Sequence, residues 1–140
     1  MTLEAVGFWV GFVASIGTVL ELSKIVVEYI RTTAGANDER ADLINEITIT
    51  SAVLAKLQSQ AQLPEWQISI QSPNSLEAPV YQFKVALQNL ETKLRPSRNP
   101  FVKVTSRWIW YFRKDEYQDI LSKIERSKSN LMILLQQDQK

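Results

Sequence analysis

An uncharged run of apolar residues opens the chain from Ala5 to Leu20, with Glu4 before it and Glu21 after it. A helix that is apolar on all sides is either the buried centre of a bundle or a membrane segment. These sixteen residues span about 24 Å as a helix, which is less than the roughly 30 Å hydrocarbon core of a bilayer. The length alone therefore leaves both alternatives open.

After this run, apolar residues recur every three or four positions and charged residues take the opposite side, which is typical of an amphipathic helix. We predict one long helix from about Leu3 to Arg31, within an N-terminal helical segment over residues 1–34. Thr2 is the expected N-cap, and Gly35 is expected to end the helix. The first half of this helix is apolar on all sides, and the second half is amphipathic.

A second helix is predicted from about Asp38 to Gln60, with Asn37 or Asp38 as its N-cap. Several β-branched residues between positions 47 and 53 favour a strand, but the spacing of three and four around them favours a helix more strongly. The expected buried face of this helix contains Leu43, Ile44, Ile47, Ser51, Leu54 and Leu57.

Residues 62–79 form the longest irregular segment, with prolines at positions 64, 73 and 79. Trp66, Ile68 and Ile70 alternate with polar residues, which on period alone predicts a short strand. No second strand is predicted to pair with it, and an unpaired strand is not stable by itself. We therefore expect a loop or one helical turn that fixes Trp66 against the bundle.

Two more long helices are predicted in the second half of the chain. The first begins at Pro79 and ends before Pro96 and Pro100. Its apolar seam contains Val80, Phe83, Leu87, Leu90 and Leu94. The last helix covers residues 113–137, after a short helix over residues 101–110. Its core face contains Tyr117, Ile120, Leu121, Ile124, Leu131, Leu134 and Leu135.

These elements predict a single domain over residues 1–140 of the all-α class. It is a helical bundle of four main helices plus a short helix and a Pro-containing loop. The composition argues against an enzyme, because the 140 residues include no cysteine and no histidine. No phosphate-binding loop or nucleophile motif is present, and we expect no catalytic residue, no cofactor and no metal site. No Lys or Arg precedes the apolar run, which argues against a secretory signal.

Small residues form a stripe on one side of the first predicted helix. Gly7 and Gly11, continued by Ala14, Ser15 and Thr18, are spaced so that they share one face. Such stripes let helix backbones approach closely, in membranes especially. The alternative is that small residues are needed where helices cross in a crowded core, and for the stripe alone this alternative is favoured. Each glycine also costs about 1 kcal/mol relative to alanine, so we expect an adaptable helix.

Charge is unevenly distributed, because residues 1–70 carry four Lys/Arg against eight Asp/Glu and residues 71–140 carry twelve against seven. Basic residues lie beside tryptophan and tyrosine between positions 95 and 114. This mixture suits an anionic bilayer surface, single-stranded nucleic acid or a plain solvated surface. The net charge is only +1 and no nucleic-acid motif is present, so nucleic acid is not an expected partner. The expected anionic-lipid-binding residues are Arg95, Arg98, Lys103, Arg107, Arg113 and Lys114.

Three stretches of the chain resemble the fungal HeLo-like domain, the N-terminal effector domain of many fungal NOD-like (NACHT or NB-ARC) receptors. The most specific is residues 110–138, WYFRKDEYQDILSKIERSKSNLMILLQQD. This stretch is similar to the family pattern Trp-x-Phe-x-Lys-x-Glu, followed by Ile-Leu-x-x-Ile-Glu-Arg-x-Lys-Ser. Residues 81–96 and residues 39–54 also resemble the family, so that the resemblance covers nearly the whole chain.

The resemblance implies a cell-death effector of the heterokaryon-incompatibility or innate-immunity type. It also implies a bundle similar to the four-helix domain of mixed-lineage kinase-like pseudokinases. In such effectors a C-terminal receptor or amyloid-forming region clusters the domains. The cytoplasmic protein then oligomerises and inserts its N-terminal helix into the plasma membrane, so anionic lipids and further copies of the chain are implied partners.

The residues expected to enter the membrane are Val6, Gly7, Phe8, Trp9, Val10, Gly11, Phe12, Val13, Ile16, Gly17 and Leu20. The alternative function is a non-lytic signalling or adaptor domain of a NOD-like receptor that acts by homo- or hetero-oligomerisation.

Overall fold

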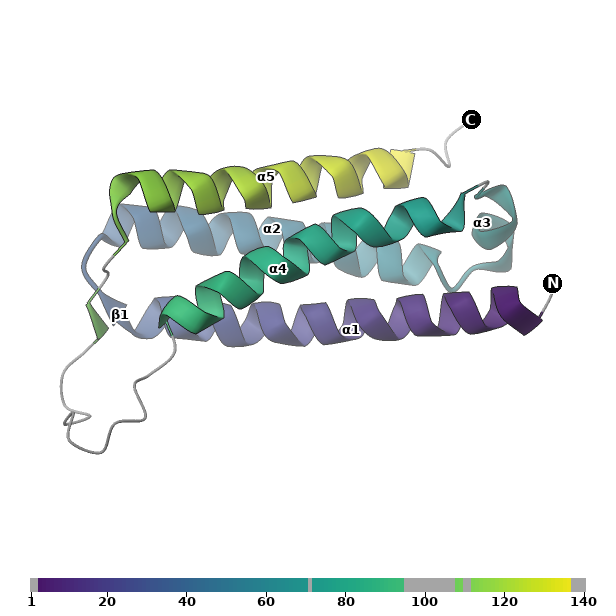
Figure 1. Ribbon diagram of the computed structural model, residues 1–140, viewed down its shortest axis with the longest axis horizontal. Helices are drawn as coiled ribbons and strands as arrows, with labels where there is room; N and C mark the ends of the chain where they lie inside the picture. Colours follow the sequence, from purple (N-terminus) through teal and green to yellow (C-terminus); the bar gives the residue numbers. More distant parts are fainter. Residues whose placement is uncertain (1–2, 71, 95–107, 110–111, 137–140) are drawn as a thin grey trace.

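The computed structural model of the protein describes residues 3–70, 72–94, 108–109 and 112–136 (Figure 1). Its long helices are α1 (Leu3–Thr32), α2 (Asn37–Gln60), α4 (Glu77–Leu94) and α5 (Lys114–Gln136). The short helix α3 (Pro64–Ser69) and the 3-10 turn η1 (Pro73–Leu76) connect α2 to α4. The prediction of an all-α bundle with four main helices is confirmed.

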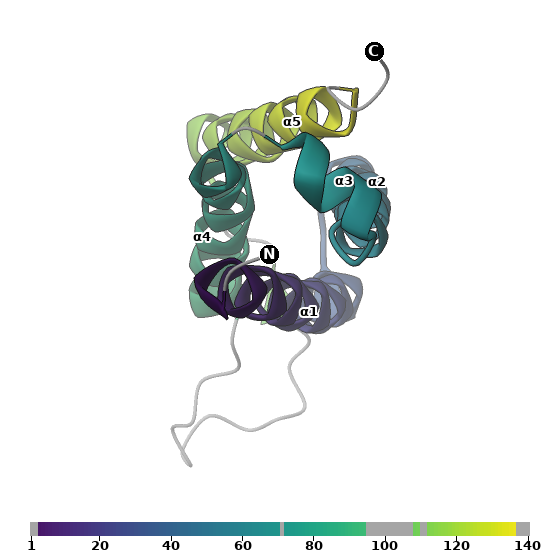
Figure 2. The same ribbon diagram turned by 90° about the vertical axis from the view of Figure 1, so that its right-hand side faces the viewer.

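The four long helices form a bundle in which each helix packs against two neighbours. Helix α1 contacts α2 and α4, and α5 contacts the same two helices from the other side. Figure 2, a view along the bundle, shows α1 and α5 on opposite sides with α2 and α4 between them. Helix α1 therefore lies at an edge of the bundle and not at its centre.

The core is built from one face of each long helix, as the spacing of three and four predicts. The five predicted seam residues of α4 are all buried. The buried apolar residues of α5 are Tyr117, Ile120, Ile124, Leu131 and Leu134. Those of α2 are Leu43, Ile47, Leu54 and Leu57. Thr50 is the fully buried polar residue of α2, and its hydroxyl donates to the backbone oxygen of Glu46 at 2.7 Å. Ser51 is half-buried.

Ion pairs fasten α5 to both of its neighbours. Lys128 Nζ lies 2.9 Å from Glu46 Oε2 on α2, and these side chains are only 22% and 17% exposed. Lys93 on α4 pairs with Glu116 on α5. In contrast, the ion pairs that the structure describes for α1 stay within that helix: Glu21 with Lys24, and Glu28 with Arg31. Among the described residues, α5 is therefore joined to its neighbours by ion pairs and α1 is not.

The turn between α1 and α2 differs from the predicted one. Gly35 and Ala36 have positive φ angles of 90° and 48°, and Ala36 is the N-cap residue of α2, without a side-chain hydrogen bond. The prediction of Asn37 or Asp38 as the N-cap is wrong, because Asn37 is already the first helical residue. Two successive left-handed residues reverse the chain in a tight turn, so no residue remains for an extended cap. The expected cap Thr2 of α1 lies outside the described residues.

Helix α4 begins at Glu77, two residues earlier than predicted, because η1 runs directly into it. Pro79 fits the third position, since the N–H groups of a first helical turn have no intrahelical acceptor. Pro96 and Pro100, the predicted end of this helix, lie outside the described residues. Helix α5 matches the predicted segment 113–137 to within one residue at each end.

Trp108 and Ile109 form the strand β2, which pairs in parallel with β1 (Thr33–Ala34). The prediction of a helix over residues 101–110 is wrong at these two positions, and the rest of that segment lies outside the described residues. The two strands meet because the chain leaving α1 and the chain entering α5 lie at the same end of the bundle (Figure 1). The prediction for Trp66 is confirmed, because it lies on α3 and is 1% exposed.

Candidate functional site

Helix α1 is the candidate functional element. Among the described helices it alone is long and apolar enough to cross a membrane, and only 28% of its most apolar window is buried in the bundle. A helix at the centre of a soluble core is buried on most sides, whereas most positions in this window of α1 are exposed or half-buried. The opening apolar run therefore contributes one face to the core, through Trp9, Phe12, Ile16 and Val19, and its remaining positions are exposed or half-buried.

The predicted membrane-entering residues divide into three groups by exposure. The exposed ones are Val6, Gly7, Val10 and Gly11. The half-buried ones are Phe8, Val13, Gly17 and Leu20. The buried ones are Trp9, Phe12 and Ile16. Val10 is 66% exposed, and Leu3, which precedes Glu4 and the apolar run, is 92% exposed. The outer side of the helix therefore presents large apolar groups to solvent.

The small-residue stripe of α1 does not lie at a helix crossing in the core. A Cβ atom added to Gly7 or to Gly11 would meet no atom within 4 Å outside its local helix. The core-crossing alternative, favoured from sequence, is therefore wrong for both glycines. Instead they line a groove of about 770 Å³ between α1 and α4. Gly17 belongs to the other side of the helix, where a Cβ would lie 3.5 Å from Gln58 Nε2.

Two specific contacts join the N-terminal half of α1 to the bundle, in addition to the core packing of Phe12 and Ile16. The indole ring of Trp9 packs edge-on against that of Trp66, with 5.7 Å between ring centroids. Gln58 on α2 donates a hydrogen bond from Nε2 to the backbone oxygen of Val13 at 3.1 Å. Sequence reasoning missed Gln58, and no signal marks it, because glutamines are common on exposed helix faces. The fastening of this half is mainly apolar.

Hydroxyl groups on α1 are satisfied within the helix. The Ser15 hydroxyl donates to the backbone oxygen of Phe12 at 2.8 Å, and that of Thr18 donates to Ala14 at 3.2 Å. Because donor and acceptor belong to the same helix, these hydrogen bonds are kept when the helix changes its surroundings. These two polar side chains therefore add little to the cost of placing α1 in an apolar surrounding.

The C-terminal end of α1 is held by Arg40, which sequence reasoning also missed. Its guanidinium donates to the backbone oxygens of Gly35 at 2.7 Å, Ile30 at 3.4 Å and Arg31 at 3.5 Å. The carbonyls of Ile30 and Arg31 are among those that a helix end leaves without intrahelical donors, and that of Gly35 belongs to the turn after α1. A positive charge there also opposes the negative end of the helix dipole. The two ends of α1 are therefore held by different forces, a cation at one end and aromatic packing at the other.

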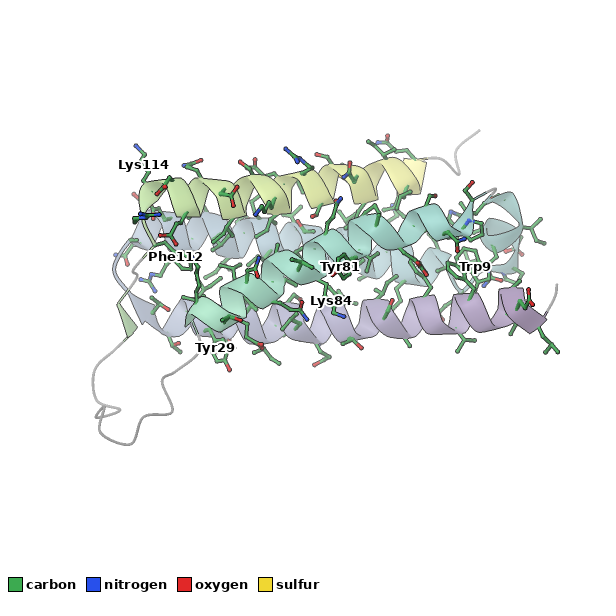
Figure 3. The ribbon with its side chains drawn as sticks, in the orientation of Figure 1. Trp9, Tyr29, Tyr81, Lys84, Phe112 and Lys114 are labelled. Atoms are coloured by element: carbon green, nitrogen blue, oxygen red, sulfur yellow. The ribbon has the colours of Figure 1, made fainter. Side chains whose placement is uncertain are left out.

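The predicted lipid-binding residues are only partly described. Arg95, Arg98, Lys103 and Arg107 lie outside the described residues. Lys114 is exposed, and Arg113 Nε lies 2.8 Å from Glu116 Oε1. Figure 3 shows Lys114 and Phe112 at the end of the bundle where α1 finishes near Tyr29, while Trp9 lies at the far end. Lys114, in the described part of the basic cluster, is thus at the opposite end of the bundle from Trp9.

Two groups near the start of α5 have shifted pKa values. The hydrogen bond from Lys93 and the positive charges of Lys93 and Arg113 lower the pKa of the Glu116 carboxyl, against a smaller opposing effect of desolvation. Burial raises the pKa of the Tyr117 hydroxyl, and the carboxylates of Asp42, Glu39 and Glu125 raise it further. Both shifts are accounted for by ion pairing at Glu116 and by burial and nearby carboxylates at Tyr117.

The described residues contain no group of three or more His, Cys, Asp or Glu side chains that could hold a metal ion. Comparisons of the chain with protein-family models, with curated proteins and with solved structures found no match. The arrangement itself therefore carries the functional argument: an apolar helix at the edge of a bundle, uncovered on its outer side.

Proposed function

We propose that the protein is a membrane-permeabilising cell-death effector of the HeLo-like class. The observation that carries this proposal is the position of α1, whose uncharged half lies at the surface of the bundle with 28% of its apolar window buried. In the resting state the protein is cytoplasmic. On activation it clusters through a C-terminal receptor or amyloid-forming region, oligomerises and inserts the first half of α1 into the plasma membrane.

The energetics support an exchange of bundle for lipid around α1. Trp9, Phe12 and Ile16 are the buried anchors in the inserting segment. Lipid tails are as apolar as a leucine core, so these side chains lose little when they move from the bundle into a bilayer. Val10 and the other exposed apolar groups gain, because in the bundle they face water. The direction of the exchange therefore favours lipid once the helix reaches it.

The separation of the two membrane-binding regions suggests an order of events. The end of the bundle that carries Lys114 binds anionic headgroups first, while the Trp9 end still lies at the far end of the bundle. The first half of α1 then leaves the bundle, and Arg40 keeps the C-terminal end of the helix attached. A helix of about 24 Å reaches most of the way through the hydrocarbon core, and thinning or oligomerisation accommodates the difference.

The test is dye leakage from liposomes with and without anionic lipid, using a protein whose α1 is locked. The variant carries Gly17→Cys and Gln58→Cys, joined by a short bis-maleimide linker. These would be the only thiols, since the chain has no cysteine, and Gln58 Nε2 lies 3.5 Å from the Cβ position of residue 17. The matched control is the same variant with both thiols capped separately by N-ethylmaleimide.

The capped control should release dye from anionic liposomes, and the locked protein should bind those liposomes without releasing it. Equal leakage by the locked protein would show that α1 does not need to leave the bundle, and the mechanism would be wrong. Binding without leakage by the capped control and by the unmodified chain would instead favour the non-lytic adaptor function.

A further inference from the structure

The groove between α1 and α4 is open and has a distinctive lining. Its floor is the bare backbone at Gly7 and Gly11, and its far wall is formed by Ala78 and by Tyr81, which is 63% exposed. The groove has a volume of about 770 Å³ and runs along the N-terminal half of α1, from Gly7 to Val19. A helix can therefore approach the backbone of α1 here much more closely than over a surface of large side chains.

Charges of opposite sign lie at the two ends of this groove. Glu77 lines the end near Gly7, and Glu4 lies one helical turn before Phe8 on the same face of α1. Lys84 lines the other end, over the middle of α1 (Figure 3). None of these three residues takes part in an ion pair within the part of the chain that the structure describes.

We propose that this groove is a self-association surface, on which two copies of the chain pack their α1 helices antiparallel across a two-fold axis near Gly11. Positions equally far before and after Gly11 then face each other, so that position 4 of one copy meets position 18 of its partner, about 10 Å from the axis. Lys84 lies beside that position, and Glu4 of each copy therefore faces Lys84 of the other.

Charge complementarity selects this arrangement and this occupant. A parallel pairing would bring Glu4 against Glu4 and Lys84 against Lys84, which is repulsive. The antiparallel pairing forms two Glu4–Lys84 contacts, and each copy offers the same surface, as a two-fold interface requires. The dimer also covers the small-residue stripe of α1 in solution. The inference does not depend on membrane insertion, because it concerns the chain in the absence of lipid.

Single-cysteine variants of the otherwise cysteine-free chain test the axis. In a Gly11→Cys variant the two thiols lie next to each other on the two-fold axis, within the roughly 6 Å between Cα atoms that a disulfide needs. In the matched Thr18→Cys variant, on the same exposed face, the two thiols lie about 21 Å apart. The Gly11→Cys protein should form a disulfide-linked dimer on mild oxidation, and the Thr18→Cys protein should remain largely unlinked. Equal linking of both would overturn the proposal.

Charge reversal tests the ends of the groove. Sedimentation equilibrium of the unmodified chain should show a reversible dimer. Glu4→Lys or Lys84→Glu alone should raise the dissociation constant of this dimer by roughly tenfold, because each dimer gains two like-charge contacts. The double variant Glu4→Lys with Lys84→Glu should restore dimerisation, and circular dichroism should be unchanged throughout. A chain that stays monomeric, or a dimer that the double variant does not rescue, would mean that something other than a second copy occupies the groove. Liposome leakage is measured separately, so failure here leaves the proposed function standing.

Discussion

The indole of Trp9 on α1 meets the indole of Trp66 on α3 edge to face, at 5.7 Å between ring centroids and an interplanar angle of 68°. The two residues are 5% and 1% exposed. Trp66 Nε1 is buried and has no hydrogen-bond partner among the described residues, so the contact is made by apolar packing alone. The short helix α3 thus places Trp66 against the N-terminal part of α1.

Replacing Trp66 should separate packing from polar effects. Trp66→Ala should lower the free energy of unfolding by about 3–5 kcal/mol, the usual cost of removing a buried tryptophan. Trp66→Phe should lower the free energy of unfolding clearly less, because it keeps an aromatic ring. It also removes a buried N–H without a hydrogen-bond partner, whose desolvation costs about 1–3 kcal/mol. Urea unfolding followed by circular dichroism measures both values. An equal loss in the two variants would mean that the indole N–H is satisfied in solution.

Arg40 should control the C-terminal end of α1. Arg40→Ala removes the guanidinium that donates to the carbonyls of Ile30, Arg31 and Gly35, and should lower the free energy of unfolding by about 1–3 kcal/mol. Hydrogen exchange should increase around residues 30–37 and stay unchanged near Trp9. The control is Arg126→Ala, which removes an exposed arginine of α5 and should change the stability by less than about 0.5 kcal/mol. Faster exchange over the whole of α1 would contradict separate fastening of its two ends.

Stability should depend on pH through Glu116. Its pKa is lowered from the ordinary value of 4.5, chiefly by the hydrogen bond from Lys93, so the folded protein binds this proton more weakly than the unfolded chain does. The stabilisation is therefore fully present above pH 4.5 and is lost as the pH falls through the lower folded-state pKa. Glu116→Gln should be less stable than the unmodified protein at neutral pH, and the difference should shrink in acid. A difference that does not change with pH would contradict the role of the charge.

Charge reversal in the basic cluster should weaken liposome binding. Arg98→Glu, Lys103→Glu and Arg107→Glu together should reduce binding to anionic liposomes in a co-sedimentation assay, and binding of the unmodified protein should fall as salt rises. The matched control reverses Lys56, Lys123 and Arg126, which are exposed elsewhere and change the net charge equally. Equal loss in both triple variants would mean that net charge alone, and not the cluster, governs binding.

Local periodicity is sufficient to predict much of this fold. The spacing of apolar residues on α4, from Val80 to Leu94, identifies a helix and its buried face, because side chains three and four positions apart share one side of any α-helix. The prolines around residues 62–79 mark the interruption, and the lack of a partner strand predicts correctly that Trp66 does not lie in a strand. The composition likewise excludes thiol and imidazole chemistry. Each of these conclusions needs only neighbouring residues or simple counts.

Contacts between distant residues were decided only by the tertiary structure. The sequence shows that the first half of α1 is apolar on all sides, but not that its outer side stays uncovered, since that depends on where the other helices lie. For the same reason it does not show that Gly7 and Gly11 face a groove, that Gln58 reaches Val13, or that Trp108 pairs with Thr33. Nor does it show that Lys114 and Trp9 lie at opposite ends of the bundle. Local periodicity determines which face of a helix is apolar, whereas the packing of all the helices determines which part of that face remains free.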